Sequence, residues 1–144
     1  MTLEKMTTKA QEAVREAVDL ASRRGNPEVH PEHLCFAVIG QEGGVGRPLI
    51  QKAGGDHAAL AGALEQRIAG FPQQSGGTDT RVSSRLLTVL QGAEDEAKAM
   101  KDEFVSTEHL LLSAAKRDRE VKRLLEQAGL DRDALLGALT EVRG

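Results

Sequence analysis

Histidine and cysteine are the residue types of this 144-residue chain that first suggest metal binding or nucleophilic catalysis. His33 and His109 stand in the phrases "PEHL" and "TEHL", which lack the second histidine of an H-E-x-x-H zinc motif. No two histidines in the chain are four residues apart, so none pair on one helical face. We therefore expect no metal site and interpret these two side chains as half-buried packing residues. The lone Cys35 lies in an apolar run and is expected to be a small buried thiol.

Other catalytic patterns are also missing from the sequence. The glycines of "GQEGGVGRP" (40–48) suggest a phosphate loop, but no G-x-x-x-x-G-K-[ST] motif can be found in the chain. Neither a G-x-S-x-G motif nor a serine or cysteine with a plausible histidine and acid partner is evident. The sequence accordingly predicts no active site, cofactor site or nucleotide site in this chain.

Carboxylates at the starts of expected helices are the remaining polar candidates. Glu32 and Glu108 are each the second residue of such a helix, where a negative charge complements the helix dipole. That structural role is the main interpretation for Glu32. Asp102, Glu103 and Glu108 gather near one point of the second half of the chain, which raises the functional interest of Glu108. A merely solvated acidic corner remains the alternative.

Composition limits the partner classes. Hydrophobic residues make up 40% of the chain and charged residues 28%, which is ordinary for a globular domain. Aromatic residues are only 2%, too few for a base-stacking surface, and the net charge of −3 argues against nucleic acid or an anionic membrane as partner. No run approaches the length of a membrane span, so a cytoplasmic protein is expected.

An internal duplication organises the whole chain. "VHPEHLCFAV" (29–38) returns as "VSTEHLLLSA" (105–114), and "LIQKAGGDHAALAGAL" (49–64) matches "LLEQAGLDRDALLGAL" (124–139) at nine of sixteen positions without a gap. The offset is 76 residues at the first pair and 75 at the second. One residue has therefore been gained or lost in the loop near 41–44 or near 116–118.

Every periodic segment has the spacing of a helix, and none shows sustained strand alternation. The fold class is predicted to be all-α, with Thr8 and Gln11 as a capping box and Ser83, Ser106, Asp56 and Asp131 as further helix caps. Eight short helices are expected, at about 7–24, 31–41, a short helix ending near 53, 57–69, 84–100, 107–117, 119–128 and 132–142.

One domain over 1–144 is predicted, built from two four-helix repeats (1–70 and 81–144) joined by a polar linker (71–80). Segment 73–79 is expected to be its most mobile internal part. A helix with a single apolar face needs a partner, so the two repeats should share a core about a pseudo-twofold axis. The seam between them would then offer a groove for a peptide.

The quoted motifs carry a family resemblance. "MTLEKMTTKAQEAVREAVDLASRRGNPEVHPEHL", "LIQKAG", "DEFVSTEHLLL" and "LLEQAGLDRDALLGAL" together span nearly the whole chain and closely resemble the amino-terminal domain of Hsp100/Clp chaperones. The start "LEKMTTKAQEAV" is most similar to the ClpB disaggregase branch. Domains of the ClpC type, which the chain also resembles, carry "GTEH" in both repeats, whereas this sequence has "HPEH" and "STEH".

The resemblance implies a mobile substrate-binding and regulatory domain of a hexameric ATP-driven machine. It implies unfolded or aggregated polypeptide as the main partner of a monomeric isolated domain, with a co-chaperone or adaptor as a further partner class. ATP and Mg would belong to ATPase modules beyond Gly144. By position, the family's polar residues at the groove edge correspond to Thr7, Asp102 and Glu108. With the seam residues, the expected substrate-binding set is Leu3, Met6, Thr7, Leu90, Asp102, Phe104, Val105 and Glu108.

The sequence departs from the family pattern at the expected groove. Gly92, Glu96 and His109 stand where similar ClpB domains often have apolar residues. The groove is therefore expected to be more polar and to bind substrate more weakly. A ClpC- or ClpA-type unfoldase domain working with a protease, or a stand-alone adaptor of the same fold, is the alternative.

Overall fold

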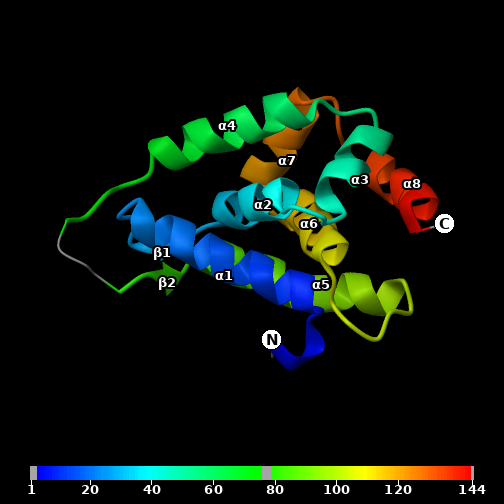
Figure 1. The fold of residues 1–144 in the computed structure, drawn as a ribbon, viewed down its shortest axis with the longest axis horizontal. Helices are drawn as coiled ribbons and strands as arrows, with labels where there is room; N and C mark the ends of the chain where they lie inside the picture. The colour runs from blue at the N-terminus through cyan, green and yellow to red at the C-terminus, as the bar shows by residue number, and fades with distance from the viewer. Residues whose placement is uncertain (1–2, 76–78, 144) are drawn as a thin grey trace.

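The structure, a computed structural model, describes residues 3–75 and 79–143. A short 3-10 helix, η1 (Leu3–Lys5), precedes eight α-helices and two very short strands. The elements are α1 (Thr8–Arg23), β1 (Glu28–Val29), α2 (Pro31–Gly40), α3 (Gly46–Lys52), α4 (His57–Ala69), β2 (Arg81–Val82), α5 (Ser84–Ala99), α6 (Thr107–Arg117), α7 (Arg119–Gln127) and α8 (Arg132–Arg143). The all-α prediction is confirmed, and the eight helices follow the predicted order in two equivalent sets of four (Figure 1).

Short backbone pairings join the two halves in a reciprocal way. β1, which precedes α2, pairs in parallel with β2, which precedes α5. Met6, which precedes α1, makes the same kind of parallel bridge with Val105, which precedes α6. Adding 76 to Met6 and Val29 gives Val82 and Val105, so each pairing is the counterpart of the other. This exchange expresses the pseudo-twofold relation between the halves.

Helices α2 and α6 lie at the centre of the molecule (Figure 1) and contact each other. Both are buried almost all round, as expected for helices covered on every side by other helices. Cys35 on α2 is buried, which confirms that prediction, and burial raises the pKa of its thiol. The carboxylates Glu32 and Glu108 are the second residues of these two central helices.

The repeated apolar positions of α1 and α5 face the core, with two exceptions. Ala10, Ala17, Ala21, Leu86, Ala93 and Ala97 are buried, whereas the equivalent residues Val14 and Leu90 are only partly buried. Because both exceptions occupy the same place in the two halves, the symmetry itself leaves a little apolar surface on each outer helix.

Two local predictions need correction. The cap of α1 is Thr7, not Thr8: its hydroxyl accepts a hydrogen bond from the Ala10 amide at 3.1 Å, and the Gln11 side chain donates to the Met6 carbonyl. Strands were not predicted, because a two-residue pairing is too short to show alternation. The side-chain caps Asp56, Ser83 and Asp131 are confirmed, as is the position of Ser106.

The chain between α4 and β2 is held at its start. The Gln74 amide donates to the Gly25 carbonyl at 2.8 Å, and the Asn26 side chain donates to the Pro72 carbonyl. Of the segment predicted to be most mobile, Gln74 is therefore attached to the end of α1, while residues 76–78 lie outside the described part. Among the described helices, none has the length and apolar character that crossing a membrane requires.

Candidate functional site

Most of the residues predicted to share one site meet where α1 and α6 begin. The Thr7 amide donates to the Val105 carbonyl at 2.9 Å, and the Val105 amide donates to the Lys5 carbonyl at 2.7 Å. Met6 and Val105 are buried, so they fix the junction and do not offer surface to a ligand. Leu3 and Phe104 beside them are about half exposed, at 49% and 47%. Leu90 lies apart on α5 and contributes only a partly buried surface.

A pocket of about 390 Å³ opens at this junction. We call it the Glu108 pocket. Its walls are the first turns of α1 and α6 and the loop before α3. It is lined by Thr7, Thr8, Lys9, Gly43, Gly44, Val45, Ser106, Thr107 and Glu108. Two helix N-termini, whose amides carry partial positive charge, therefore face one hollow together with one lysine and one carboxylate.

The carboxylates of this region are organised by Arg143, at the end of α8. Its guanidinium contacts Glu108 Oε2 at 3.1 Å and Asp102 Oδ2 at 2.9 Å. Hydrogen bonds from Arg143 and His109 lower the pKa of Asp102. Burial opposes the charge of Glu108, but hydrogen bonds from Ser106, its own amide and Arg143 outweigh it and lower its pKa. The predicted acidic corner is thus an ion-paired cluster, with Glu103 alone left exposed.

Lys9 is turned away from Glu108. Its ammonium donates to the Glu42 carbonyl at 3.1 Å and lies 4.0 Å from the Glu12 carboxylate. Lys9 therefore joins the first turn of α1 to the loop before α3 and does not pair with Glu108. Among the described residues, the cation that contacts Glu108 is Arg143 of α8.

The equivalent place in the other half is filled. We call it the Glu32 site. Arg85, the counterpart of Lys9, extends from the first turn of α5 and contacts both carboxylate oxygens of Glu32 at 3.1 Å. It also makes a two-pronged contact with Asp118, at 2.8 and 3.0 Å. These bonds raise the pKa of Arg85 against the opposing effect of burial. Arg67 of α4 contacts Glu32 at 2.9 Å.

Each central helix begins with the same histidine clamp. His33 Nδ1 accepts from the His30 amide and His109 Nδ1 from the Ser106 amide, both at 2.8 Å. Their Nε2 atoms contact Asn26 at 2.9 Å and Asp102 at 2.7 Å. Both rings are fully buried, so the half-buried prediction was wrong in degree, because the clamp draws the ring beneath the helix start. Within 3–75 and 79–143, no three potential ligands cluster as a metal ion would require.

The expectation of a more polar open groove along α5 is also wrong. Gly92 is buried beneath Arg117, whose side chain leaves no room for a Cβ there. Glu96 is buried and paired with Arg117 at 2.8 Å and with Arg132. Burial opposes its charge, but these two arginines lower the pKa of Glu96. Gly92, Glu96 and His109 are therefore internal and do not line an open surface.

Arginines complete these sites, and the sequence predictions missed them. Arg85 is the second residue of α5, where a cation opposes the helix dipole unless a carboxylate compensates it. That position is a signal that could have pointed to Glu32 and Asp118. Arg143 has a favourable place at the end of its helix, so nothing in its local sequence points to Glu108.

Comparison with known proteins identifies the family of this chain. The model of the Clp repeat N-terminal domain matches residues 5–128. The chain belongs to this family. It is 37% identical over 142 residues to the chaperone protein ClpB of Rhodopirellula baltica and 38% identical over 146 residues to that of Propionibacterium freudenreichii. These alignments cover 99% and 100% of this chain but only 16% and 17% of the relatives, so it spans about a sixth of their length.

Solved structures of Clp repeat N-terminal domains share the fold. The Hsp104 N-terminal domain of Candida albicans has a TM-score of 0.86 at 23% identity, covering 97% of this chain and 92% of that one. The ClpV N-domain of Vibrio cholerae has a TM-score of 0.80 at 20% identity, covering 97% and 86%. A complex of a ClpV N-domain with a VipB peptide has a TM-score of 0.73 at 21% identity, covering 92% and 83%.

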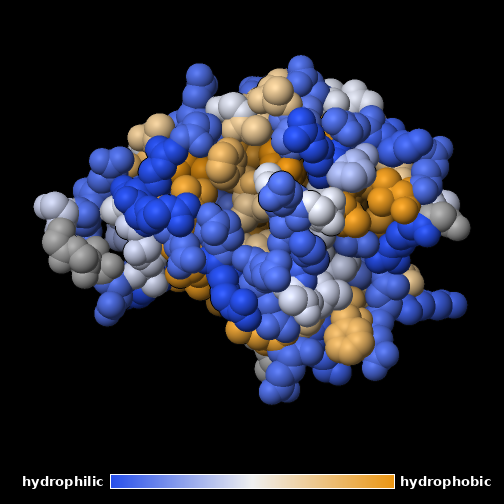
Figure 2. Space-filling view, in the orientation of Figure 1, coloured by the Kyte–Doolittle hydropathy of each residue, from blue (hydrophilic) through white to orange (hydrophobic). Residues whose placement is uncertain are grey.

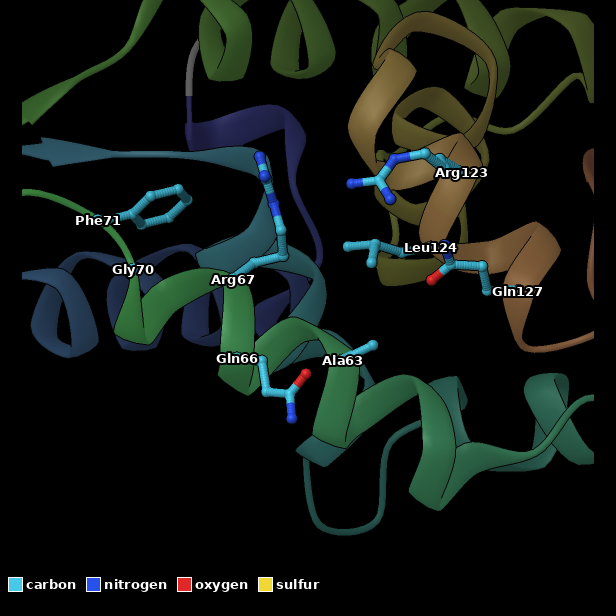
Figure 3. A pocket seen from close by; sticks show the side chains of 8 residues that line it. All are labelled: Ala63, Gln66, Arg67, Gly70, Phe71, Arg123, Leu124 and Gln127. Atoms are coloured by element: carbon cyan, nitrogen blue, oxygen red, sulfur yellow. The ribbon is translucent and has the colours of Figure 1, made fainter.

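One further hollow of this Clp domain lies between α4 and α7 (Figure 3) and measures about 340 Å³. Arg67 from α4 and Arg123 from α7 border it, as do Phe71 and Leu124. Both arginines already contact Glu120, at 3.6 and 2.7 Å, and Arg67 also contacts Glu32. Its cations therefore have carboxylate partners, and we interpret the hollow as a junction between two helices.

Proposed function

We propose that this chain is the polypeptide-binding and regulatory N-terminal domain of a ClpB-like ATP-dependent chaperone. Its binding surface would be the junction of the two halves: the Glu108 pocket with Thr7, Asp102 and the exposed Leu3 and Phe104. Leu90 would extend this surface along α5, while Met6 and Val105 would hold it together. The family, the names of the sequence relatives and an open pocket between two helix starts support this proposal.

The main observation in support of this binding surface is that the Glu32 site, the counterpart of the Glu108 pocket, is filled by the chain itself. At the Glu32 site, the chain's own Arg85 contacts the carboxylates of Glu32 and Asp118. The Glu108 pocket has the equivalent helix starts and the equivalent carboxylate, but Lys9, the counterpart of Arg85, contacts the Glu42 carbonyl and not Glu108. A basic side chain of a bound polypeptide can occupy it in the same way, while apolar neighbours contact Leu3 and Phe104.

Such binding should be weak. Apolar surface on the face in Figure 2 occurs as separate patches between charged side chains, and the exposed large apolar residues Leu3, Val82, Leu87 and Phe104 are few. Little area would be buried, so dissociation constants of roughly micromolar or above are expected. Weak contacts suit a domain that must release its polypeptide to another part of a machine.

The wider assignment is part of the same proposal. The chain would form one domain, with 1–70 and 81–144 as its repeats and 71–80 as their linker. In the parent chain, ATP and Mg would belong to separate ATPase modules, with assembly as a homohexamer in the cytoplasm. The ClpV complex with a VipB peptide supports a second candidate function, the recognition of a specific partner peptide.

An NMR titration with a permanently unfolded protein, reduced and carboxymethylated α-lactalbumin, tests the site. Signals of Thr7, Asp102, Phe104 and Glu108 should shift together, and Glu108→Gln should weaken the response. Glu126→Gln, which removes an exposed carboxylate of α7, is the matched control and should bind the unfolded protein as well as the unsubstituted domain does. Shifts confined to α4 and α8, or none at millimolar concentration, would exclude this surface.

A further inference from the structure

The groove between α5 and α6 is filled by the chain itself. Arg117, at the end of α6, lies across Gly92 of α5. Its guanidinium donates to Glu96 at 2.8 Å and to the Ser113 hydroxyl at 3.3 Å. An arginine side chain of the chain itself therefore fills this groove.

The equivalent groove between α1 and α2 is open. Gln41 stands in the place of Arg117, and its shorter side chain lines this groove and donates to the Lys9 carbonyl of α1 at 2.9 Å. A hollow of about 350 Å³ remains, with Ala13 and Ala37 among its walls and Phe36 beside them. The hollow is larger than a guanidinium needs, so it has room for an aliphatic stem as well.

Two carboxylates border this groove. Glu12 and Glu16 are exposed residues of α1, one turn apart, and both line the hollow. Their only recorded cationic contacts among the described residues are exposed: Lys9 at 4.0 Å from Glu12 and Arg23 at 3.1 Å from Glu16. Exposed pairs of this kind are weak, so both carboxylates can exchange their partner for a new cation.

We propose that the α1–α2 groove is a second polypeptide-binding site, which takes an arginine side chain of a partner segment. The guanidinium would lie between Glu12 and Glu16, with its face toward Phe36, and an apolar neighbour in the segment would contact Ala13 and Ala37. The two grooves correspond in position but differ in their carboxylates. Glu96 of α5 pairs with the arginine of the filled groove, whereas Glu12 and Glu16 of α1 would pair with the arginine of the partner segment. The groove shares no residue with the Glu108 pocket.

The probe is the peptide acetyl-Leu-Arg-Leu-Arg-Leu-amide, titrated into the isotopically labelled domain. Amide signals of Phe36, Ala37 and Gly40 should shift with one saturation curve. The same peptide with citrulline in place of arginine keeps the shape and loses the charge. It should bind the groove about tenfold more weakly, because both charge-assisted contacts are lost.

Two variants locate the site. Glu12→Gln combined with Glu16→Gln should reduce affinity at the groove signals about fivefold or more. The matched control, Glu126→Gln combined with Asp133→Asn, removes two exposed carboxylates elsewhere and should change it little. Gln41→Arg should place a guanidinium beside Glu16, which stands where the other half has Gly92, and should reduce the shifts at Phe36 and Ala37 by competing with the peptide.

The outcomes separate this proposal from the proposed function. Shifts only around Thr7 and Glu108 would overturn the second site and leave the Glu108 pocket standing. Shifts at Phe36 and Ala37 without any at Thr7 and Glu108 would support the second site alone. An equal loss of affinity in the control variant, or equal binding of the citrulline peptide, would show nonspecific attraction and overturn the groove as an arginine site.

Discussion

The Glu32 site and the Glu108 pocket occupy equivalent places in the two halves, but only one is closed. At the Glu32 site, Arg85 joins two carboxylates in a planar two-pronged geometry, and the Glu32 side chain is fully buried. At the Glu108 pocket, Lys9 contacts a backbone carbonyl and the pocket remains open. One duplicated unit has thus produced a structural joint in one place and a candidate binding surface in the other.

The difference follows from the loop that forms the far wall of each place. In the second half, α6 leads directly into α7 through Asp118, whose carboxylate caps α7 and contacts Arg85. In the first half, five residues (41–45) separate α2 from α3 and include two glycines. No carboxylate occupies the place of Asp118 as a helix cap there, because Val45 caps α3 without a side-chain hydrogen bond.

The largest expected effect is the loss of Glu32. Glu32→Ala leaves Arg85 and Arg67 without their shared buried carboxylate and should lower the free energy of unfolding by about 3 kcal/mol. Glu108→Ala removes a carboxylate with one arginine partner and should cost about 1 kcal/mol. Urea denaturation followed by circular dichroism measures both. Equal losses would mean that the two places are energetically alike despite their geometry.

The next effect concerns the histidine clamp of His33. Burial, with a smaller contribution from His30, lowers the pKa of His33 to about 4 from 6.5. His33 in the unfolded chain therefore binds a proton more readily than in the folded chain. The free energy of unfolding must decrease as the pH is lowered. The expected loss is about 1.5 kcal/mol between pH 6.5 and 5, measured by denaturation at each pH.

His33→Gln should flatten that slope even though it lowers stability throughout. A slope that persists in His33→Gln would assign the proton uptake to another group.

Much of the fold could be predicted from the sequence because duplication doubles the information. Two copies of the helix pattern agree on the order of the helices and on the buried faces of α1 and α5, and the resemblance spans the chain. The error at Thr8 arose because two adjacent threonines can both cap a helix, and only backbone geometry selects Thr7. The β1–β2 pairing could not be predicted, because it results from how the halves dock.

The candidate site was harder to predict because it depends on charges from distant helices. The meeting of Thr7, Val105 and Glu108 followed from the repeat. Arg143 reaches Glu108 from 35 residues away in sequence, and no local pattern indicates that pairing. Gly92 and Glu96 were read as groove residues, because the sequence does not reveal that Arg117 covers them.

A smaller effect separates the two equivalent helix caps. Thr7 and Ser83 each accept a hydrogen bond from the third amide of their helices, at 3.1 and 3.0 Å. Alanine at either position should cost about 1 kcal/mol of stability, whereas Thr7→Ser should keep the cap. Only the change at Thr7 should also weaken binding of the unfolded protein, measured by NMR titration after correcting for the folded fraction. Weaker binding in Ser83→Ala as well would mean that helix stability alone governs the response.

The smallest change tests whether the open pocket can be closed by the chemistry of its counterpart. Lys9→Arg places a guanidinium where Arg85 stands in the other half, with a planar fork that can reach Glu108. The new pair would be partly exposed, so stability should rise by only a few tenths of a kcal/mol. Affinity for unfolded polypeptide should nevertheless fall severalfold, because the side chain competes with the ligand for one carboxylate. Lys52→Arg, an exposed pair partner of Glu141, is the matched control. Unchanged binding in Lys9→Arg, with Glu108 shown by NMR to have gained the arginine contact, would mean that polypeptide does not use the space that Arg85 fills on the other side.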